Sequence, residues 1–116
     1  MKDAILHNPR CSKSREALKL LRDNGVELPV VEYLQQPLSK NELRDLCKLL
    51  GVKPLDIVRT KEELFGELGL AKDNGYSDAQ WLDVLASHPK LMERPIVVYH
   101  GKAVIGRPPE KILDLL

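Results

Sequence analysis

The chain is poor in cysteine, nearly neutral and without a long apolar run, and each of these absences excludes a class of protein. Two cysteines in 116 residues cannot build the disulfide framework of a small secreted domain. A formal net charge of +1 argues against a broad nucleic-acid-binding face. No apolar run approaches the roughly 18 residues of a membrane-spanning helix, and the first residues lack the apolar region of a signal peptide. We therefore expect a cytoplasmic protein that forms a single domain over residues 1–116, with no nucleic-acid or membrane partner.

Several motifs with recognised chemistry are missing too. The two cysteines and three histidines show no paired Cys-x-x-Cys or His-x-x-x-His spacing, so we expect no bound metal. Neither a Gly-rich nucleotide loop nor a Cys-x5-Arg phosphate loop is present. Ser14 stands where a dithiol redox site would place its second cysteine, after Cys11. A redox reaction at Cys11 would therefore need an external reductant.

The most informative segment runs from His7 to Arg15 and joins a short apolar strand to a helix. Cys11 falls where that helix should begin, so its sulfur faces unpaired backbone N–H groups and the positive end of the helix dipole. Both favour the thiolate, which is the nucleophilic form of cysteine. The same N–H groups can hold an anion. The segment therefore predicts a reactive thiol aimed at an anionic substrate.

The hydrophobic pattern predicts a mixed sheet built from two halves. The first half reads as a parallel βαβ unit, and the second as a hairpin followed by a helix. The predicted elements are strand 4–6, helix 14–24, strand 30–34, strands 96–99 and 103–105, and helix 110–116. This order predicts the α/β class and a thioredoxin-like fold, βαβ…ββα, with a mixed four-stranded sheet.

A helical insertion of about residues 39–92 separates the second strand from the third. The capping-box pairs predicted to start its helices are Ser39 with Glu42, Thr60 with Glu63, and Ser77 with Gln80. Gly51 is expected to end the first of these helices. Cys47 lies among the apolar residues of the same helix, so we expect it to fill the core.

Three segments carry a family resemblance. The His-Asn-Pro-x-Cys-x-x-Ser-Arg pattern at residues 7–15 resembles the active-site signature of the glutaredoxin-linked arsenate reductases. Residues 91–98 resemble the segment that leads into the third strand of that family, and residues 106–110 resemble its signature before the last helix. The resemblance covers essentially the whole chain, and it is greatest to the short bacterial YfgD-type members.

The resemblance implies a monothiol oxidoreductase that reduces arsenate, or a related oxyanion, to arsenite. It implies that Cys11 forms a thiolate–arsenate adduct, that glutathione then releases arsenite, and that glutaredoxin reduces the mixed disulfide left on Cys11. It also implies three substrate-binding arginines, Arg59, Arg94 and Arg107, whose planar forks suit a tetrahedral oxyanion. Glutathione enters as a co-substrate, and no bound cofactor is implied.

The charged and polar residues around the thiol are candidates for tuning its pKa, and most of them have a second possible role. His7 and Arg10 are candidates for lowering the pKa of the thiol by their charge, but His7 could equally hydrogen-bond the loop. Lys13 and Arg15 could equally be surface charges of the helix. Thioredoxin-like folds resemble one another in a cis proline at the position of Pro95, which would hold the preceding arginine beside the thiol.

Two other functions remain open for this fold. The same fold resembles that of the Spx-type regulators, which bind RNA polymerase and use a Cys-x-x-Cys switch that Ser14 removes here. A glutathione-dependent thiol transferase acting on protein mixed disulfides would use Cys11 without any oxyanion, and it would not need Arg107.

Overall fold

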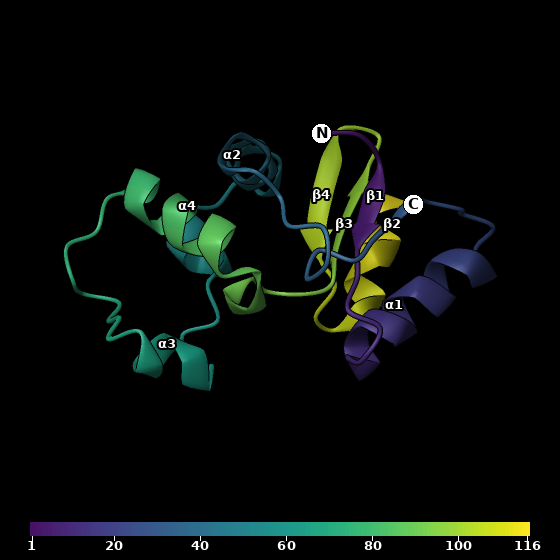
Figure 1. Ribbon diagram of the computed structural model, residues 1–116. Helices are drawn as coiled ribbons and strands as arrows, with labels where there is room; N and C mark the ends of the chain where they lie inside the picture. Colours follow the sequence, from purple (N-terminus) through teal and green to yellow (C-terminus); the bar gives the residue numbers. More distant parts are fainter. The chain divides into compact units, whose positions relative to one another are not determined.

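In the computed structural model, which describes residues 1–116, the chain divides into a sheet unit and a helical unit (Figure 1). The sheet unit combines Met1–Pro37 with Arg94–Leu116, and the helical unit is Leu38–Glu93. The boundaries of the helical unit lie within one residue of the predicted insertion at both ends. That residues 1–116 form a single domain stays a prediction.

The sheet has the predicted mixed topology, with strand order β2-β1-β3-β4. Its strands are β1 (Ala4–Leu6), β2 (Val30–Val31), β3 (Ile96–Tyr99) and β4 (Lys102–Ile105). Strand β1 pairs in parallel with β2 and antiparallel with β3, and β3 pairs antiparallel with β4. This is the thioredoxin-like α/β arrangement that the order of elements predicts.

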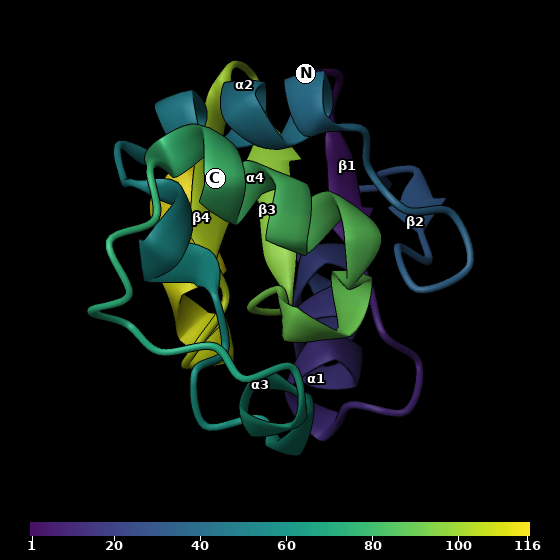
Figure 2. The same ribbon diagram turned by 60° about the vertical axis from the view of Figure 1, so that its left-hand side comes forward.

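Two helical segments pack with the sheet through a shared apolar core. They are α1 (Ser12–Asp23) and the 3-10 helix η3 (Pro109–Leu115), which contact each other beside the strands (Figure 2). The fully buried residues of this core are Ile5, Ala17, Leu21, Val97 and Ile112. Because side chains alternate along a strand, Ile5 and Val97 project from the same face of the sheet toward α1.

Helix α1 and strand β4 differ from the predicted ranges by one or two residues at their ends, and two other elements of the sheet unit differ in length or type. The predicted strand 30–34 is wrong in length, because the carbonyl of Glu32 accepts hydrogen bonds from the amides of Gln35 and Gln36 and turns the chain after Val31. The last helix is a 3-10 helix that begins at Pro109, whereas the pattern predicts an α-helix from Glu110. Hydrophobic spacing does not separate these two helix types over so short a segment.

The helical unit contains three α-helices and two 3-10 helices. They are α2 (Lys40–Leu50), η1 (Pro54–Ile57), α3 (Glu63–Glu67), α4 (Asp78–Ser87) and η2 (Pro89–Leu91). Helices α2 and α4 pack together, and Trp81 on α4 stacks on Phe65 with a ring-centroid distance of 6.1 Å. None of the helices in the chain combines the length and the apolar character that a membrane crossing requires.

Two of the three predicted capping boxes are confirmed, and one is wrong. Ser39 caps α2 and Ser77 caps α4, each with its predicted partner. The box predicted at Thr60 does not form, because α3 begins later, with Glu62 at its N-cap and no side-chain cap. The carboxylate of Glu62 is instead paired with Arg59, at 2.6 Å from Nη1.

Candidate active site

Cys11 lies at the N-cap of α1, as predicted, and is a free, buried thiol. Burial alone would raise its pKa. The backbone N–H groups of Ser14 and Lys13 and the guanidinium of Arg94 outweigh burial, so the net pKa of the thiol is lowered. The two N–H groups act on the sulfur as local dipoles, since neither meets the geometry of a full capping hydrogen bond. The thiol therefore ionises more readily than an ordinary cysteine.

The loop before Cys11 is held by one hydrogen bond within the loop and two to the helix that follows it. The amide of Cys11 donates to the carbonyl of Asn8 at 3.0 Å, and the amide of Asn8 donates to Ser14 Oγ at 3.0 Å. Arg15 Nη1 reaches back to the carbonyl of Pro9 at 2.9 Å. These bonds fix the sulfur at the helix terminus before any substrate arrives, which is the preorganisation that catalytic groups require.

His7 hydrogen-bonds Ser14 in the first turn of α1 and is not one of the charges acting on the thiol. Its Nδ1 lies 2.7 Å from Ser14 Oγ, and the side chain is buried. Desolvation lowers the pKa of His7, the nearby charges of Arg22 and Arg15 lower it further, and Glu32 opposes them. The imidazole is therefore neutral near pH 7, which fits its predicted hydrogen-bonding role rather than its predicted charge role.

Arg94 is the arginine that the structure places on the thiol. Its charge and a side-chain hydrogen bond both lower the pKa of Cys11. The Arg94–Pro95 peptide bond is cis, and Pro95 begins the segment that enters β3. The Nε and Nη1 atoms of Arg94 are buried and have no hydrogen-bond partner. Buried guanidinium N–H groups without an acceptor are costly, so they favour an anion that supplies the missing oxygens.

The other predicted arginines are placed differently. Arg107 is half-buried after β4 and makes no hydrogen bond or ion pair. Arg10 is exposed, and its side chain has no partner. Arg59 belongs to the helical unit, where Glu62 holds its guanidinium and also lies 3.5 Å from Lys90 Nζ. Of the three predicted substrate arginines, Arg94 is therefore the one that lies close enough to Cys11 to lower its pKa.

Sequence reasoning missed Gly106 as part of this site. Its amide donates to the carbonyl of Pro95 at 2.8 Å. A Cβ added at Gly106 would lie 3.0 Å from Cγ of the Pro95 ring, and 3.6 Å from Cγ2 of Ile112. Glycine therefore lets the end of β4 approach the proline that follows Arg94. The Gly-Arg-Pro-Pro segment was the available signal, but it does not reveal which atoms the glycine faces.

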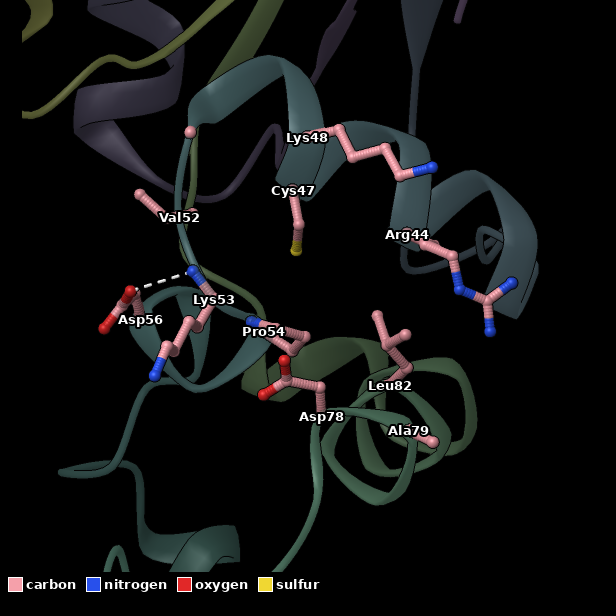
Figure 3. A pocket seen from close by; sticks show the side chains of 11 residues that line it. Arg44, Cys47, Lys48, Val52, Lys53, Pro54, Asp56, Asp78, Ala79 and Leu82 are labelled. Atoms are coloured by element: carbon pink, nitrogen blue, oxygen red, sulfur yellow. Dashed lines mark hydrogen bonds between the residues drawn. The ribbon is translucent and has the colours of Figure 1, made fainter.

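The second cysteine, Cys47, lies in a different environment in the helical unit. It lines an open cavity of about 880 Å³, and Figure 3 shows its sulfur pointing toward Pro54, Asp78 and Leu82. Burial, followed by the negative charges of Asp78 and Asp56, raises the pKa of Cys47 to about 11. This thiol stays protonated at neutral pH. No three His, Cys, Asp or Glu side chains lie close enough together to hold a metal ion.

Comparisons with known proteins agree over nearly the full chain. Residues 6–115 match the model of the ArsC family. The chain is 53% identical over 113 residues to YfgD of Escherichia coli (strain K12), covering 97% of this chain and 94% of that protein. It is 49% identical to an arsenate reductase of Neisseria meningitidis (strain MC58), covering 97% of this chain and 96% of that protein. The solved structure of an arsenate reductase from Vibrio cholerae matches with a TM-score of 0.93 at 47% identity, covering 100% of this chain and 98% of that chain.

Proposed function

The chain belongs to the ArsC family, and from that premise we propose that it is an arsenate reductase whose nucleophile is Cys11. The observation that carries the proposal is the pairing of a thiol of lowered pKa with buried, unpartnered N–H groups of Arg94. A nucleophile and an oxyanion-binding group thus meet at one helix N-terminus. An arsenate oxygen would supply the acceptor that Arg94 lacks.

In the first step, the Cys11 thiolate attacks the arsenic atom. An arsenic–sulfur bond forms, and one arsenate oxygen takes up protons and leaves as water. Arg94 donates to the remaining oxygens, where its charge stabilises the developing negative charge. We assign Arg107 to the same oxyanion, because its guanidinium is free of any protein partner. Arg59 is assigned to it by resemblance to the family.

In the second step, the sulfur of glutathione attacks Cys11 and the arsenic–sulfur bond breaks. The electron pair of the broken arsenic–sulfur bond stays on arsenic, which is reduced from As(V) to As(III) and leaves as arsenite. Cys11 is then joined to glutathione as a mixed disulfide, which glutaredoxin reduces. An external thiol is needed because Ser14 replaces a resolving cysteine and Cys47, with a pKa of about 11, is protonated. The reducing cytoplasm would supply both reductants.

Arsenite production from arsenate, with glutathione and glutaredoxin supplied, tests the proposal. We expect Cys11→Ser to abolish turnover, because serine has no thiolate to form the adduct. Cys47→Ser is the matched control and should retain turnover within about twofold, since a protonated thiol takes no part. Turnover by the Cys11 variant would contradict the assignment of the nucleophile. An inactive wild-type protein whose Cys11 is still readily alkylated would contradict arsenate as the substrate.

The orphaned N–H groups of Arg94 also distinguish this reaction from thiol transfer. A thiol transferase acting on protein mixed disulfides needs no site for an oxyanion. Arg94→Gln should therefore slow the exchange of Cys11 with a model disulfide only as far as its smaller thiolate fraction requires, while the kcat/KM for arsenate falls by a further factor of about ten. Equal losses in both reactions would favour the thiol transferase.

A further inference from the structure

A second cavity, of about 410 Å³, lies in the sheet unit along α1. Pro9, from the loop before Cys11, and Leu18 on α1 give it apolar surface, and His7 adds an uncharged wall. Arg15, Lys19, Arg22 and Asp23 also line it. We refer to this cavity as the α1 groove. Its lining combines apolar surface with three cations and one carboxylate.

The positive charge of the α1 groove is only partly neutralised by the protein. Lys19 Nζ lies 2.8 Å from Asp23 Oδ2, so these two charges cancel. The guanidinium of Arg22 makes no hydrogen bond or ion pair. Arg15 donates only to the carbonyl of Pro9, which leaves its charge unmatched by a carboxylate. An acidic partner would therefore find two unpaired guanidinium groups beside an apolar surface.

Three residues that line the α1 groove lie on the helix face that begins at Cys11. Arg15, Leu18 and Arg22 follow Cys11 at spacings that return to the same helix face. At about 1.5 Å of rise per residue, Arg22 lies about 16 Å along the axis from Cys11. A tripeptide bonded to Cys11 does not need to reach that far. A protein patch of roughly 800 Å², equivalent to a disc of about 16 Å radius, covers both positions.

We propose that the α1 groove is the docking surface for the protein thiol reductant that regenerates Cys11, and that this reductant presents acidic side chains beside its own thiol. The inference rests on the proposed function, which leaves Cys11 in a mixed disulfide with glutathione. Carboxylates of the reductant would pair with Arg15 and Arg22, and an apolar side chain would cover Leu18. Rim charges of this kind act mainly on the rate of association.

The chemistry at the docked surface is a thiol–disulfide exchange. The thiolate of the reductant attacks the glutathione sulfur, a new disulfide forms between those two atoms, and the bond to Cys11 breaks. The electron pair goes to Cys11, which leaves as a thiolate. A low pKa makes Cys11 a good leaving group, so the protein partner needs only to be aligned with the disulfide.

The test uses the Cys11–glutathione disulfide made directly with oxidised glutathione on a Cys47→Ala background. The measurement is the second-order rate constant for its reduction by an acidic bacterial glutaredoxin, followed by mass spectrometry at low salt and in 0.5 M NaCl. We expect Arg22→Glu to slow this reaction about tenfold at low salt, and the difference to shrink in high salt because the charges are screened. Arg22→Lys should keep most of the rate.

Two controls separate docking from other effects. Arg44→Glu makes the same charge change at an exposed residue of the helical unit and should alter the rate by less than about twofold. Reduction of the same disulfide by dithiothreitol should be equal in all variants, because a small uncharged thiol does not use the groove. An unchanged rate for Arg22→Glu, or an equal loss for Arg44→Glu, would overturn the inference. The assay contains no arsenate, so failure of arsenate turnover leaves its result informative.

Discussion

The two cysteines show how differently one fold can treat the same side chain. Both are free thiols with small exposed fractions, 9% for Cys11 and 5% for Cys47. Burial raises the pKa of each, so burial does not distinguish them. Cys11 meets helix N–H groups and a guanidinium, whereas Cys47 lies within a helix near two carboxylates. The charges and dipoles around a thiol, rather than its exposure, therefore decide which cysteine can react.

The largest effect that would sharpen this comparison is on stability at high pH. Because the pKa of Cys47 is raised to about 11 in the folded protein, its stabilising contribution is complete below the pKa of the unfolded thiol and is lost as pH rises toward 11. Between pH 8 and 11, the wild-type protein should lose about 2–3 kcal/mol more unfolding free energy than Cys47→Ala does. Urea denaturation at both pH values, with a reductant present, measures the difference.

Cys11 should behave in the opposite way in the same experiment. Its folded pKa is lowered, so its stabilising contribution is present above the unfolded pKa and is lost as pH falls through the folded pKa. Parallel pH profiles for the wild-type protein and Cys47→Ala would contradict the raised pKa of Cys47, and parallel profiles for the wild-type protein and Cys11→Ala would contradict the lowered pKa of Cys11.

The next effect is on the rate of alkylation at pH 7. An ordinary thiol has a pKa near about 8.5, and Cys47 lies more than two units above it, so far less of Cys47 is ionised. The more basic thiolate is also the better nucleophile, which recovers part of this difference. We expect Cys11 in the Cys47→Ala variant to react with iodoacetamide about 30-fold or more faster than Cys47 in the Cys11→Ala variant. Comparable alkylation rates would contradict the conclusion that only Cys11 is reactive.

The smallest of these effects concerns Arg94. This cation lowers the pKa of Cys11, whereas no cation lowers the pKa of Cys47. Arg94→Gln should raise the pKa of Cys11, since both the charge and the hydrogen bond to the thiol are lost. It should also raise the KM for arsenate about tenfold, the value of one charge-assisted hydrogen bond. Arg94→Lys should restore the pKa more fully than the KM, because lysine keeps the charge but not the planar fork. The pH profile of alkylation and arsenate kinetics measure the two changes separately.

The sequence predicts two of the three helix starts correctly from a capping side chain, but not the length of β2. The capping boxes at Ser39 and Ser77 form because each hydroxyl satisfies an amide three residues later. Thr60 offers the same pattern and forms no cap. The short length of β2 depends on which amides reach the carbonyl of Glu32, and hydrophobic alternation does not contain that information.

The sequence predicts which residues form the candidate site better than it predicts their protonation and hydrogen bonding. Cys11 at a helix N-cap follows from the residues alone, and so does the value of a nearby arginine. That His7 is neutral could not be predicted, because its pKa depends on burial and on charges contributed by Arg15, Arg22 and Glu32. The unpartnered N–H groups of Arg94 could not be predicted either, because they depend on the absence of any acceptor near them in the folded chain.

The contact between Gly106 and Pro95 has a consequence for how this protein can change over evolutionary time. Even one methyl group at position 106 would lie 3.0 Å from the Pro95 ring, so the ring next to Arg94 would have to shift to make room. Arg107, one residue further on, makes no hydrogen bond or ion pair within the protein, so a substitution there removes no internal bond. A change of oxyanion preference therefore needs less rearrangement of the protein at residue 107 than at residue 106, where the Pro95 ring would have to move.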